Sequence, residues 1–433
     1  MVVLVKTLQV ILALSLLIIV HELGHFLWAR IFGIRVEKFY LFFDVRGKAI
    51  ARWHWGETEF GIGWIPFGGY CKIAGMIDES MDLEQMKKAP QPWEFRSKPA
   101  WQRLFVMAGG VLNNFIFAVL VYCLIAGIWG EAYISNEDAH IAPNELAQEM
   151  GFRLGDHIIA FDDYEPKDFG MLQADLARRN VSKATVLRES DTLTLYIDQA
   201  YIGDVLNSPL MFDLALPFIV DSVRFDSPNA AVGIQSGDRI AAFNGTAVGY
   251  IQDAREVLSG LRGQTALASV VRGADTLALP VQVDTAGQIG VFLRSPKIER
   301  LQYSFFEAIP AGIKLTGKTM DGYIKDLGLL VRPSTGAYKS VGSFIAIGQV
   351  FPSVWDWYRF LSILALLSVM LGIMNLLPIP ALDGGHILIT LYEMITRRKP
   401  SERFLVVTQM IGMVLLLGLM VLAFGNDIAR LIH

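Results

Sequence analysis

Four long stretches of apolar residues dominate the pattern of hydrophobic and polar positions along this chain of 433 residues. They cover residues 7–29, 104–130, 360–382 and 404–426, and Glu22 is the one Asp, Glu, Lys or Arg within them. A helix that crosses a bilayer needs about 20 apolar residues. We therefore predict four transmembrane helices, because a soluble protein would have to bury four helices of unusual length. A signal peptide is the alternative for the first stretch, but no small-residue cleavage site follows it.

The composition agrees with a membrane protein. Residues of the types AVILMFWYC make up 53% of the chain and charged residues only 18%, below the roughly 25% typical of soluble domains. The formal net charge of −4 does not indicate a nucleic-acid partner, whereas the apolar stretches indicate the lipid bilayer. Two cysteines, Cys71 and Cys123, are too few for a disulfide scaffold, and we expect both to be reduced thiols.

Basic residues gather between the first and second apolar stretches and again between the third and fourth. Lysine and arginine are enriched in cytoplasmic loops. We therefore expect both connections to face the cytoplasm. The two termini and the long segment 131–354 are then expected on the outer side.

The long middle segment contains an internal repeat. Residues 151–163 can be aligned with residues 233–245, and each copy has a Gly-Asp turn, an apolar strand and a second turn. In the second copy, Asn244 and Gly245 indicate a hairpin, and a helix is expected at 251–261. Both copies resemble PDZ domains, which bind extended peptides by adding a strand to a sheet edge. Two interpretations stay open: the domains bind peptide ligands, or they act only as spacers or a size filter.

Residues 301–354 combine charged and apolar positions at near-helical spacing, as at Ile309, Ile313 and Lys314. This pattern predicts an amphipathic helix that lies on the outer face of the membrane. A helix that covers a neighbouring domain would have the same pattern.

The first apolar stretch contains His21-Glu22-Leu23-Gly24-His25. Two histidines at positions i and i+4 share one face of a helix and can bind one cation. In the HExxH pattern the imidazoles bind zinc, and the carboxylate acts as general base on a water. Ionisable residues within a membrane helix are costly unless they are paired or bound to a metal. Interhelical hydrogen bonds, or a proton or metal relay in a transporter, are the alternative explanations.

A zinc site needs a third protein ligand, and Asp383 is the candidate. It follows the third stretch in the run Asn375-Leu-Leu-Pro378-Ile-Pro380-Ala-Leu-Asp383-Gly-Gly. The prolines interrupt helical hydrogen bonding, and irregular backbone at membrane depth is tolerated only against protein or a water-filled cavity. A carboxylate at this break, on the same side as His25, can complete a His-His-Asp site. The alternative is that Asp383 only marks the membrane edge.

These paired motifs, together with the PDZ-like repeat, resemble the site-2 protease family of intramembrane metalloproteases over essentially the whole chain. The resemblance implies a membrane α-helical fold with four transmembrane helices, a membrane-associated β-hairpin and two inserted α+β PDZ-like domains. The Zn²⁺ ligands that it implies are His21, His25 and Asp383, the catalytic base is Glu22, and the residues that help to hold the substrate are Asn375, Pro378 and Pro380.

Two further segments fit this family. Residues 59–70, which include Gly61 and Gly63, form a glycine-spaced apolar run. This run looks like the family's β-hairpin, whose exposed edge could pair with an unwound substrate. Asn114 matches the asparagine of the family's Gly-Pro-x-x-Asn-Phe motif in the second helix, where Val111 replaces the proline here. Gly61, Gly63 and Asn114 are therefore also candidates for substrate binding.

These motifs predict an order of segments along the chain. It is the first transmembrane helix with HExxH (1–30), a cytoplasmic or membrane-associated β region (31–100), the second transmembrane helix (101–130), the first and second PDZ-like domains (131–220 and 221–300), an amphipathic outer-face segment (301–354), the third transmembrane helix with NxxPxPxLDG (355–385), a cytoplasmic loop (386–402), and the fourth transmembrane helix with the C-terminus (403–433).

The sequence thus predicts a zinc endopeptidase that cleaves single-span membrane proteins within the bilayer. The resemblance implies anti-sigma-factor-like substrates and remnant signal peptides, in a bacterial inner membrane with periplasmic PDZ-like domains and an active site towards the cytoplasm. A non-enzymatic membrane scaffold or chaperone that presents PDZ-like domains is the alternative, and a metal transporter is another. The second and fourth stretches lack ionisable groups, which argues against transport.

Overall fold

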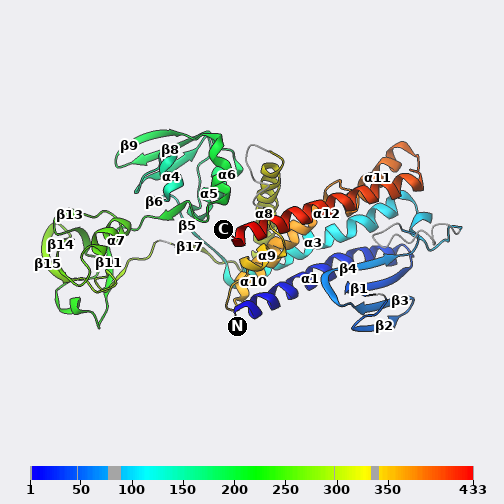
Figure 1. Ribbon diagram of the computed structural model, residues 1–433, viewed down its shortest axis with the longest axis horizontal. Helices are drawn as coiled ribbons and strands as arrows, with labels where there is room; N and C mark the ends of the chain where they lie inside the picture. The colour runs from blue at the N-terminus through cyan, green and yellow to red at the C-terminus, as the bar shows by residue number, and fades with distance from the viewer. Residues whose placement is uncertain (1, 46, 77–88, 297, 333–340, 433) are drawn as a thin grey trace. The chain divides into compact units, whose positions relative to one another are not determined.

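The computed structural model describes residues 2–45, 47–76, 89–296, 298–332 and 341–432 (Figure 1). The chain divides into two compact units. The first unit consists of residues 1–130, 302–328 and 338–433, and the second consists of residues 131–301 and 329–337. Each unit is described by itself below.

The first unit contains the four long apolar helices that the sequence predicts. They are α1 (Val2–Ile31), α3 (Ala100–Trp129), α10 (Trp357–Leu376) and α12 (Glu402–Ile432). All four are long and apolar enough to cross a membrane. Helix α3 packs against α1 and α10, and the three lie together in Figure 1. Its last turn ends at Gly130, whose φ of 71° stops the helix.

The third long helix is interrupted where the prolines predict a break. Helix α10 ends at Leu376, and a new helix, α11 (Asp383–Thr396), begins after six residues without helical structure. The expectation of a loop over 386–402 is wrong for most of its length, because α11 continues the chain as a helix to Thr396. It packs against α3. Two more helices, α8 (Ala308–Leu330) and α9 (Phe344–Val350), fall within the segment expected to be amphipathic.

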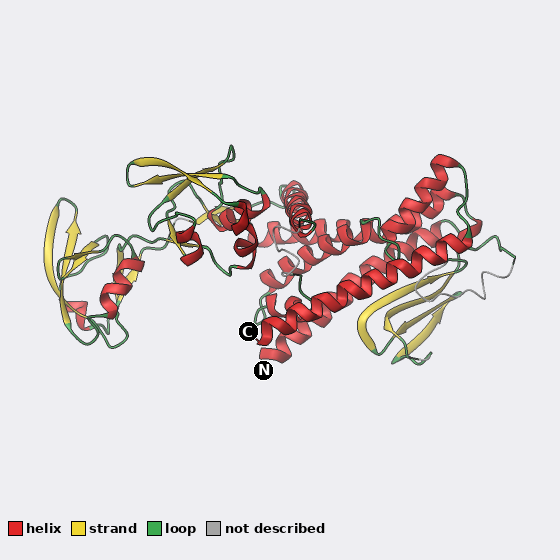
Figure 2. Cartoon of the chain, turned by 45° about the horizontal axis from the view of Figure 1, so that its top comes forward, coloured by secondary structure: helices red, strands yellow, loops and turns green. Residues whose placement is uncertain are grey.

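A four-stranded sheet follows α1 and lies beside it (Figure 2). Its strands are β1 (Val36–Phe43), β2 (Ala51–Trp55), β3 (Thr58–Ile62) and β4 (Ile65–Ile73). The order across the sheet is β2-β3-β1-β4. Residues 59–70 therefore do not form a hairpin with each other as expected: β3 pairs with β2 and β1, and β4 pairs with β1. Within the described residues, β4 is the last strand of the sheet on its side.

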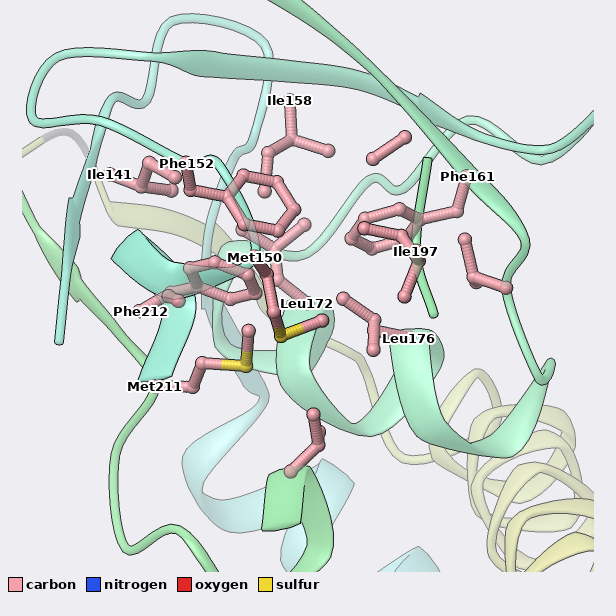
Figure 3. Packing of buried hydrophobic residues seen from close by; sticks show 14 of the residues in the cluster. Ile141, Met150, Phe152, Ile158, Phe161, Leu172, Leu176, Ile197, Met211 and Phe212 are labelled. Atoms are coloured by element: carbon pink, nitrogen blue, oxygen red, sulfur yellow. The ribbon is translucent and has the colours of Figure 1, made fainter. Parts of the chain in front are cut away.

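The second unit begins with a domain whose core contains Phe152, Phe161 and Phe212 (Figure 3). The rings of Phe152 and Phe212 meet edge to face, with centroids 5.0 Å apart. Its elements are β5 (Glu131–Ile134), β6 (Ile141–Pro143), α4 (Glu145–Glu149), β7 (His157–Phe161), α5 (Leu172–Arg178), β8 (Lys183–Arg188), β9 (Asp191–Tyr196), α6 (Ile202–Asn207) and β10 (Phe212–Leu214). Strands β7, β8 and β9 form its three-stranded sheet, and β10 pairs with β6.

The rest of the second unit has a separate core around Phe218 and Phe243. Its elements are β11 (Val220–Val223), β12 (Arg239–Phe243), β13 (Thr246–Ala247), α7 (Ile251–Ser259), β14 (Thr265–Arg272), β15 (Asp275–Gln282), β16 (Val291–Leu293) and β17 (Ile298–Leu301). The sheet order is β13-β12-β14-β15, β11 pairs with β16, and β17 pairs with β5. Four short 3-10 helices are also described along the chain, at Phe95–Ser97, Phe169–Met171, Gln199–Tyr201 and Pro228–Ala231.

The two copies of the sequence repeat have the same local structure. In the first, Arg188 donates to both carboxylate oxygens of the buried Asp156 at 2.8 and 2.9 Å. In the second, Arg272 donates to both oxygens of the buried Asp238 at 2.7 and 2.8 Å. The aspartate of each Gly-Asp turn is thus the acceptor of a two-point ion pair that holds the turn to a strand. The Asn244-Gly245 hairpin is confirmed by the β12–β13 pairing, with φ of 47° at Asn244.

Candidate metal centre

The histidines of the HExxH motif lie one turn apart on α1 and face the first residue of α11. The Nε2 atoms of His21 and His25 are 3.4 Å apart. Asp383 Oδ2 lies 3.3 Å from the Nε2 atom of His21 and 3.4 Å from that of His25. Among the described residues these three form a group that can hold one metal ion. The local motif on α1 supplies two ligands, and the helix break supplies the third.

The spacing of these atoms fits zinc. Ligand atoms bound at about 2.0–2.1 Å in a tetrahedron lie about 3.3 Å from one another, and the three distances here are 3.3, 3.4 and 3.4 Å. Asp383 Oδ2 is also buried, and it has no hydrogen-bond partner within the described residues. A buried carboxylate oxygen is costly unless a cation or donor compensates it. Both observations favour a cation at the centre of the group.

The other ring nitrogen of each histidine is held by α3. His25 Nδ1 lies 2.8 Å from the carbonyl oxygen of Val106, which can only accept a hydrogen bond. His21 Nδ1 lies 3.1 Å from the side-chain amide of Asn114. These contacts orient both Nε2 atoms towards Asp383, as the outer contacts of metal-binding histidines generally do. Asn114 is fully buried and contacts His21. The sequence predicted a contact between Asn114 and the substrate, whereas here the residue supports a histidine.

Glycines allow α1 and α3 to approach closely enough for these contacts. A Cβ atom on Gly110 would lie 2.4 Å from His25 Nε2 and 2.7 Å from His21 Cε1. One on Gly24 would lie 2.2 Å from the carbonyl oxygen of Gly109. Any larger residue at Gly110 would therefore occupy the space of the imidazoles.

Asp383 is positioned by the irregular backbone between α10 and α11. A Cβ atom on Gly384 would lie 2.2 Å from the carbonyl oxygen of Leu377, so the chain folds back tightly on the start of α11. Ala381 has a φ of 77°, a left-handed conformation that is strained for a residue with a Cβ atom. Such strain persists where the surrounding structure holds the backbone, commonly at functional sites.

The metal-binding group opens into a cavity of about 540 Å³. Glu22 lines the same cavity, next to the two histidines that flank it on α1. Strand β4 forms another wall of this cavity. A Cβ atom on Gly69 would lie 2.5 Å from Ile18 Cγ2, so this glycine lets β4 lie against α1, one turn before the HExxH motif. The residues of β4 in the lining are Gly69, Tyr70, Cys71, Lys72 and Ile73.

Two tyrosines stiffen the sheet beside the cavity. Tyr70 donates a hydrogen bond to Asp44 at 2.9 Å, and Tyr40 donates one to Glu59 at 2.5 Å. Burial and the neighbouring carboxylates raise the pKa of Tyr40 to about 12 and also raise the pKa of Tyr70. Both phenols therefore stay protonated and keep donating, which holds β1 to its two neighbouring strands.

The remaining predicted residues divide into two groups. Asn375 lines the cavity, and its amide nitrogen lies 3.5 Å from His21 Nε2. Pro378 and Pro380 lie in the break before Asp383. Gly61 and Gly63 are not in the lining that the described residues form: Gly61 belongs to β3, and a Cβ atom on it would meet the ring of Tyr40.

Sequence reasoning missed several residues of the cavity wall, and three of them carry polar or reactive groups of interest. Cys71 comes from β4, His386 lies one turn after Asp383 on α11, and Gln409 comes from α12. The sequence holds a sign of the last, because Gln409 is a polar residue within the fourth apolar stretch. Nothing in the periodicity places Cys71 here, because that depends on which strand lies at the edge of the sheet.

Comparison with known proteins identifies the family. The model of peptidase family M50 matches residues 9–419. The regulator of sigma E protease from Haemophilus influenzae is 30% identical, covering 97% of this chain and 98% of that protein. The regulator of sigma-E protease from Escherichia coli is also 30% identical with the same coverage. A Vibrio cholerae protein assigned as a zinc metalloprotease is 29% identical, again over 97% of this chain and 98% of that protein.

These matches extend over all four long helices and both units. They agree with the metal-binding group and with the four candidate spans of a multi-pass membrane protein. The chain therefore belongs to the zinc metalloproteases of peptidase family M50.

Proposed function

We propose that this chain is an intramembrane endopeptidase that cleaves single-span membrane proteins, with zinc bound by His21, His25 and Asp383. The observation that carries the proposal is that the three candidate ligands and Glu22 share one cavity between apolar helices. A hydrolytic site within a membrane helix has access to peptide bonds that soluble proteases do not reach.

The chemistry divides between the metal and the side chains. Zinc held by these residues would supply a Lewis acid that acidifies a water molecule and polarises the scissile carbonyl group. Glu22 accepts the proton of that water and returns it to the leaving amine, so the peptide bond is replaced by a carboxylate and an amine. Asn375 is close enough to His21 to donate a hydrogen bond to the carbonyl oxygen as negative charge develops on it.

We further propose that β4 holds the substrate in an extended conformation. A transmembrane helix hides its amide groups in internal hydrogen bonds, so cleavage requires local unwinding. Among the described strands β4 pairs with β1 alone, and it lines the cavity with its residues 69–73. An unwound segment can add to its open edge and place one peptide bond beside Glu22. This proposal moves the binding edge from the expected Gly61 and Gly63 to β4, which lies on the other side of β1 from β3.

The substrates we propose are anti-sigma-factor-like proteins, with remnant signal peptides as a second group. The names of the Haemophilus influenzae and Escherichia coli relatives, both regulators of sigma E protease, support the first. The positions of the basic residues support a bacterial inner-membrane orientation with the segment 131–300 in the periplasm and the site towards the cytoplasm. In that orientation the two PDZ-like domains exclude substrates with a large periplasmic domain or bind their peptide ends.

The test is a cleavage assay with purified full-length protein and a single-span substrate in nanodiscs, with zinc measured in the same samples. Glu22→Gln should retain zinc and lose cleavage by a factor of about 10²–10⁴, whereas Asp383→Ala should lose both. Glu57→Gln, at an exposed turn between β2 and β3, is the matched control and should match the wild type. Equal cleavage by Glu22→Gln and wild type would overturn the proposal and favour a scaffold.

A further inference from the structure

Gln409 is a largely buried polar residue of α12. Its exposed fraction is 4%, and its side chain makes no hydrogen bond within the part of the chain that the structure describes. Its amide atoms are not among the described side-chain atoms that are shut off from solvent without a partner, so they reach accessible space. A bound chain that enters this space can therefore hydrogen-bond the amide.

Gln9 on α1, another buried glutamine of a candidate span, differs at its amide nitrogen. That nitrogen donates to the carbonyl oxygens of Val5 and Pro352, at 3.3 and 2.9 Å, while its buried Oε1 has no partner among the described residues. Gln9 thus ties α1 to the segment before α10. Gln409 makes no comparable tie among the described residues.

Gln409 lies beside the candidate metal centre. It lines the 540 Å³ cavity with His21, Glu22 and Asp383, and it also lines an adjoining cavity of about 270 Å³. Ala381 and His386 line both cavities too. The two spaces therefore meet at Gln409, and a chain segment that passes it has room on either side.

The close approach of α12 to the helix break fixes this position. A Cβ atom on Gly412 would lie 1.8 Å from the carbonyl oxygen of Pro380. Residues three apart share one face of a helix, so Gln409 and Gly412 face the same segment. The contact at Gly412 holds Gln409 next to the residues that lead into Asp383.

A primary amide can donate and accept at once, which is the complement of a peptide group. Strand β4 offers an open edge on one wall of the cavity, and Gln409 stands on another. We propose that Gln409 is a substrate-binding residue that hydrogen-bonds the main chain of the extended segment paired with β4. This inference rests on the proposed function, because it assigns a further contact to the same bound substrate.

The test compares Gln409→Leu with wild type in three measurements on full-length protein: kcat and KM on the single-span substrate, substrate affinity in a Glu22→Gln background, and thermal stability with zinc content. We expect about a fivefold to tenfold loss of affinity in the inactive background, the worth of one hydrogen bond, and a rise in KM. Zinc content should be unchanged, and thermal stability should not fall, because the substitution removes no hydrogen bond within the described residues.

Two controls separate a binding role from a structural one. Gln9→Leu should lower thermal stability, because it removes two hydrogen bonds. Met410→Leu, at the neighbouring half-exposed position of α12, should match wild type in all measurements. Unchanged affinity in Gln409→Leu, or a fall in its thermal stability like that of Gln9→Leu, would overturn the inference. Cleavage by wild type and its loss in Glu22→Gln report separately on the proposed function.

Discussion

The side-chain amide nitrogen of Asn114 lies 3.1 Å from His21 Nδ1, and its buried Oδ1 atom has no hydrogen-bond partner in the part of the chain that the structure describes. If His21 uses Nε2 as a ligand, its Nδ1 carries the proton and must donate. Asn114 accepts this hydrogen bond when its Oδ1 atom faces the ring. In that orientation the Oδ1 and Nδ2 atoms of the side-chain amide exchange places. The residue would thus set the tautomer of a candidate metal ligand.

Replacing Asn114 by leucine should therefore weaken zinc binding by a factor of about 10–100, the usual effect of removing such an outer contact. Competition with a chromophoric chelator measures the affinity directly and needs no substrate. Asn113→Ala is the control, because Asn113 donates to the carbonyl oxygen of Val20 and does not contact a ligand. Equal affinities of Asn114→Leu and wild type would show that His21 is oriented by other contacts.

Gly110 should not tolerate even one added methyl group. In Gly110→Ala the new Cβ atom would lie 2.4 Å from His25 Nε2, so one imidazole must move and zinc content should fall well below one per chain. Gly127→Ala on the same helix is the control, since its Cβ atom would meet Ala308 at an ordinary 3.5 Å. Metal analysis of both variants after purification tests this. Full zinc occupancy in Gly110→Ala would contradict the close packing of α1 and α3.

The ion pair between Arg103 and Glu393 should stabilise the position of Asp383. Arg103 Nη2 lies 2.6 Å from Glu393 Oε1, and both side chains are largely buried. The pair joins α3 to α11, which carries Asp383 at its start. Removing one partner leaves a buried charge, so Arg103→Met should cost about 3–5 kcal/mol of unfolding free energy.

Thermal unfolding in detergent measures this loss. The double variant Arg103→Met with Glu393→Leu should recover much of it, because no charge is then left buried. A double variant no more stable than Arg103→Met would mean that the two side chains do not act as a pair.

The second PDZ-like domain should lose stability in acid through Asp238. The hydrogen bonds from Arg272 hold the pKa of Asp238 below its usual range. A carboxyl group whose pKa is lower in the folded than in the unfolded state stabilises the fold above its unfolded pKa of about 3.9, and this contribution is lost as the pH falls through the folded pKa. The domain should therefore be stable at neutral pH and weaken below about pH 4.

Hydrogen-exchange protection factors for residues 218–293 in the full chain measure this dependence. Arg272→Ala should lower protection already at neutral pH, by about 1–3 kcal/mol, because it leaves a buried carboxylate without its main donor. Asp226→Asn is the control, since the Arg224–Asp226 pair is exposed. Protection that is independent of pH between 3 and 7 would contradict the role of Asp238.

The four long helices and the HExxH ligands could be predicted because their causes are local. The length of an apolar stretch and the spacing of His21 and His25 on one helix face are properties of neighbouring residues. The Asn244-Gly245 turn is local in the same sense. The break before Asp383 also follows from nearby prolines, although α11 continues further than the charged residues after it suggested.

The tertiary structure alone decides which of these parts meet. The sequence does not indicate that Gly110 makes room for two imidazoles, that Asn114 contacts His21, or which helices and strands Gln409 faces across the cavity. Strand order is decided in the same way: β1 inserts between β3 and β4, which separates Gly61 from the site and leaves β4 at the edge. The physical reason is that packing joins residues far apart in the chain, and hydrophobic periodicity carries no information about which faces come together.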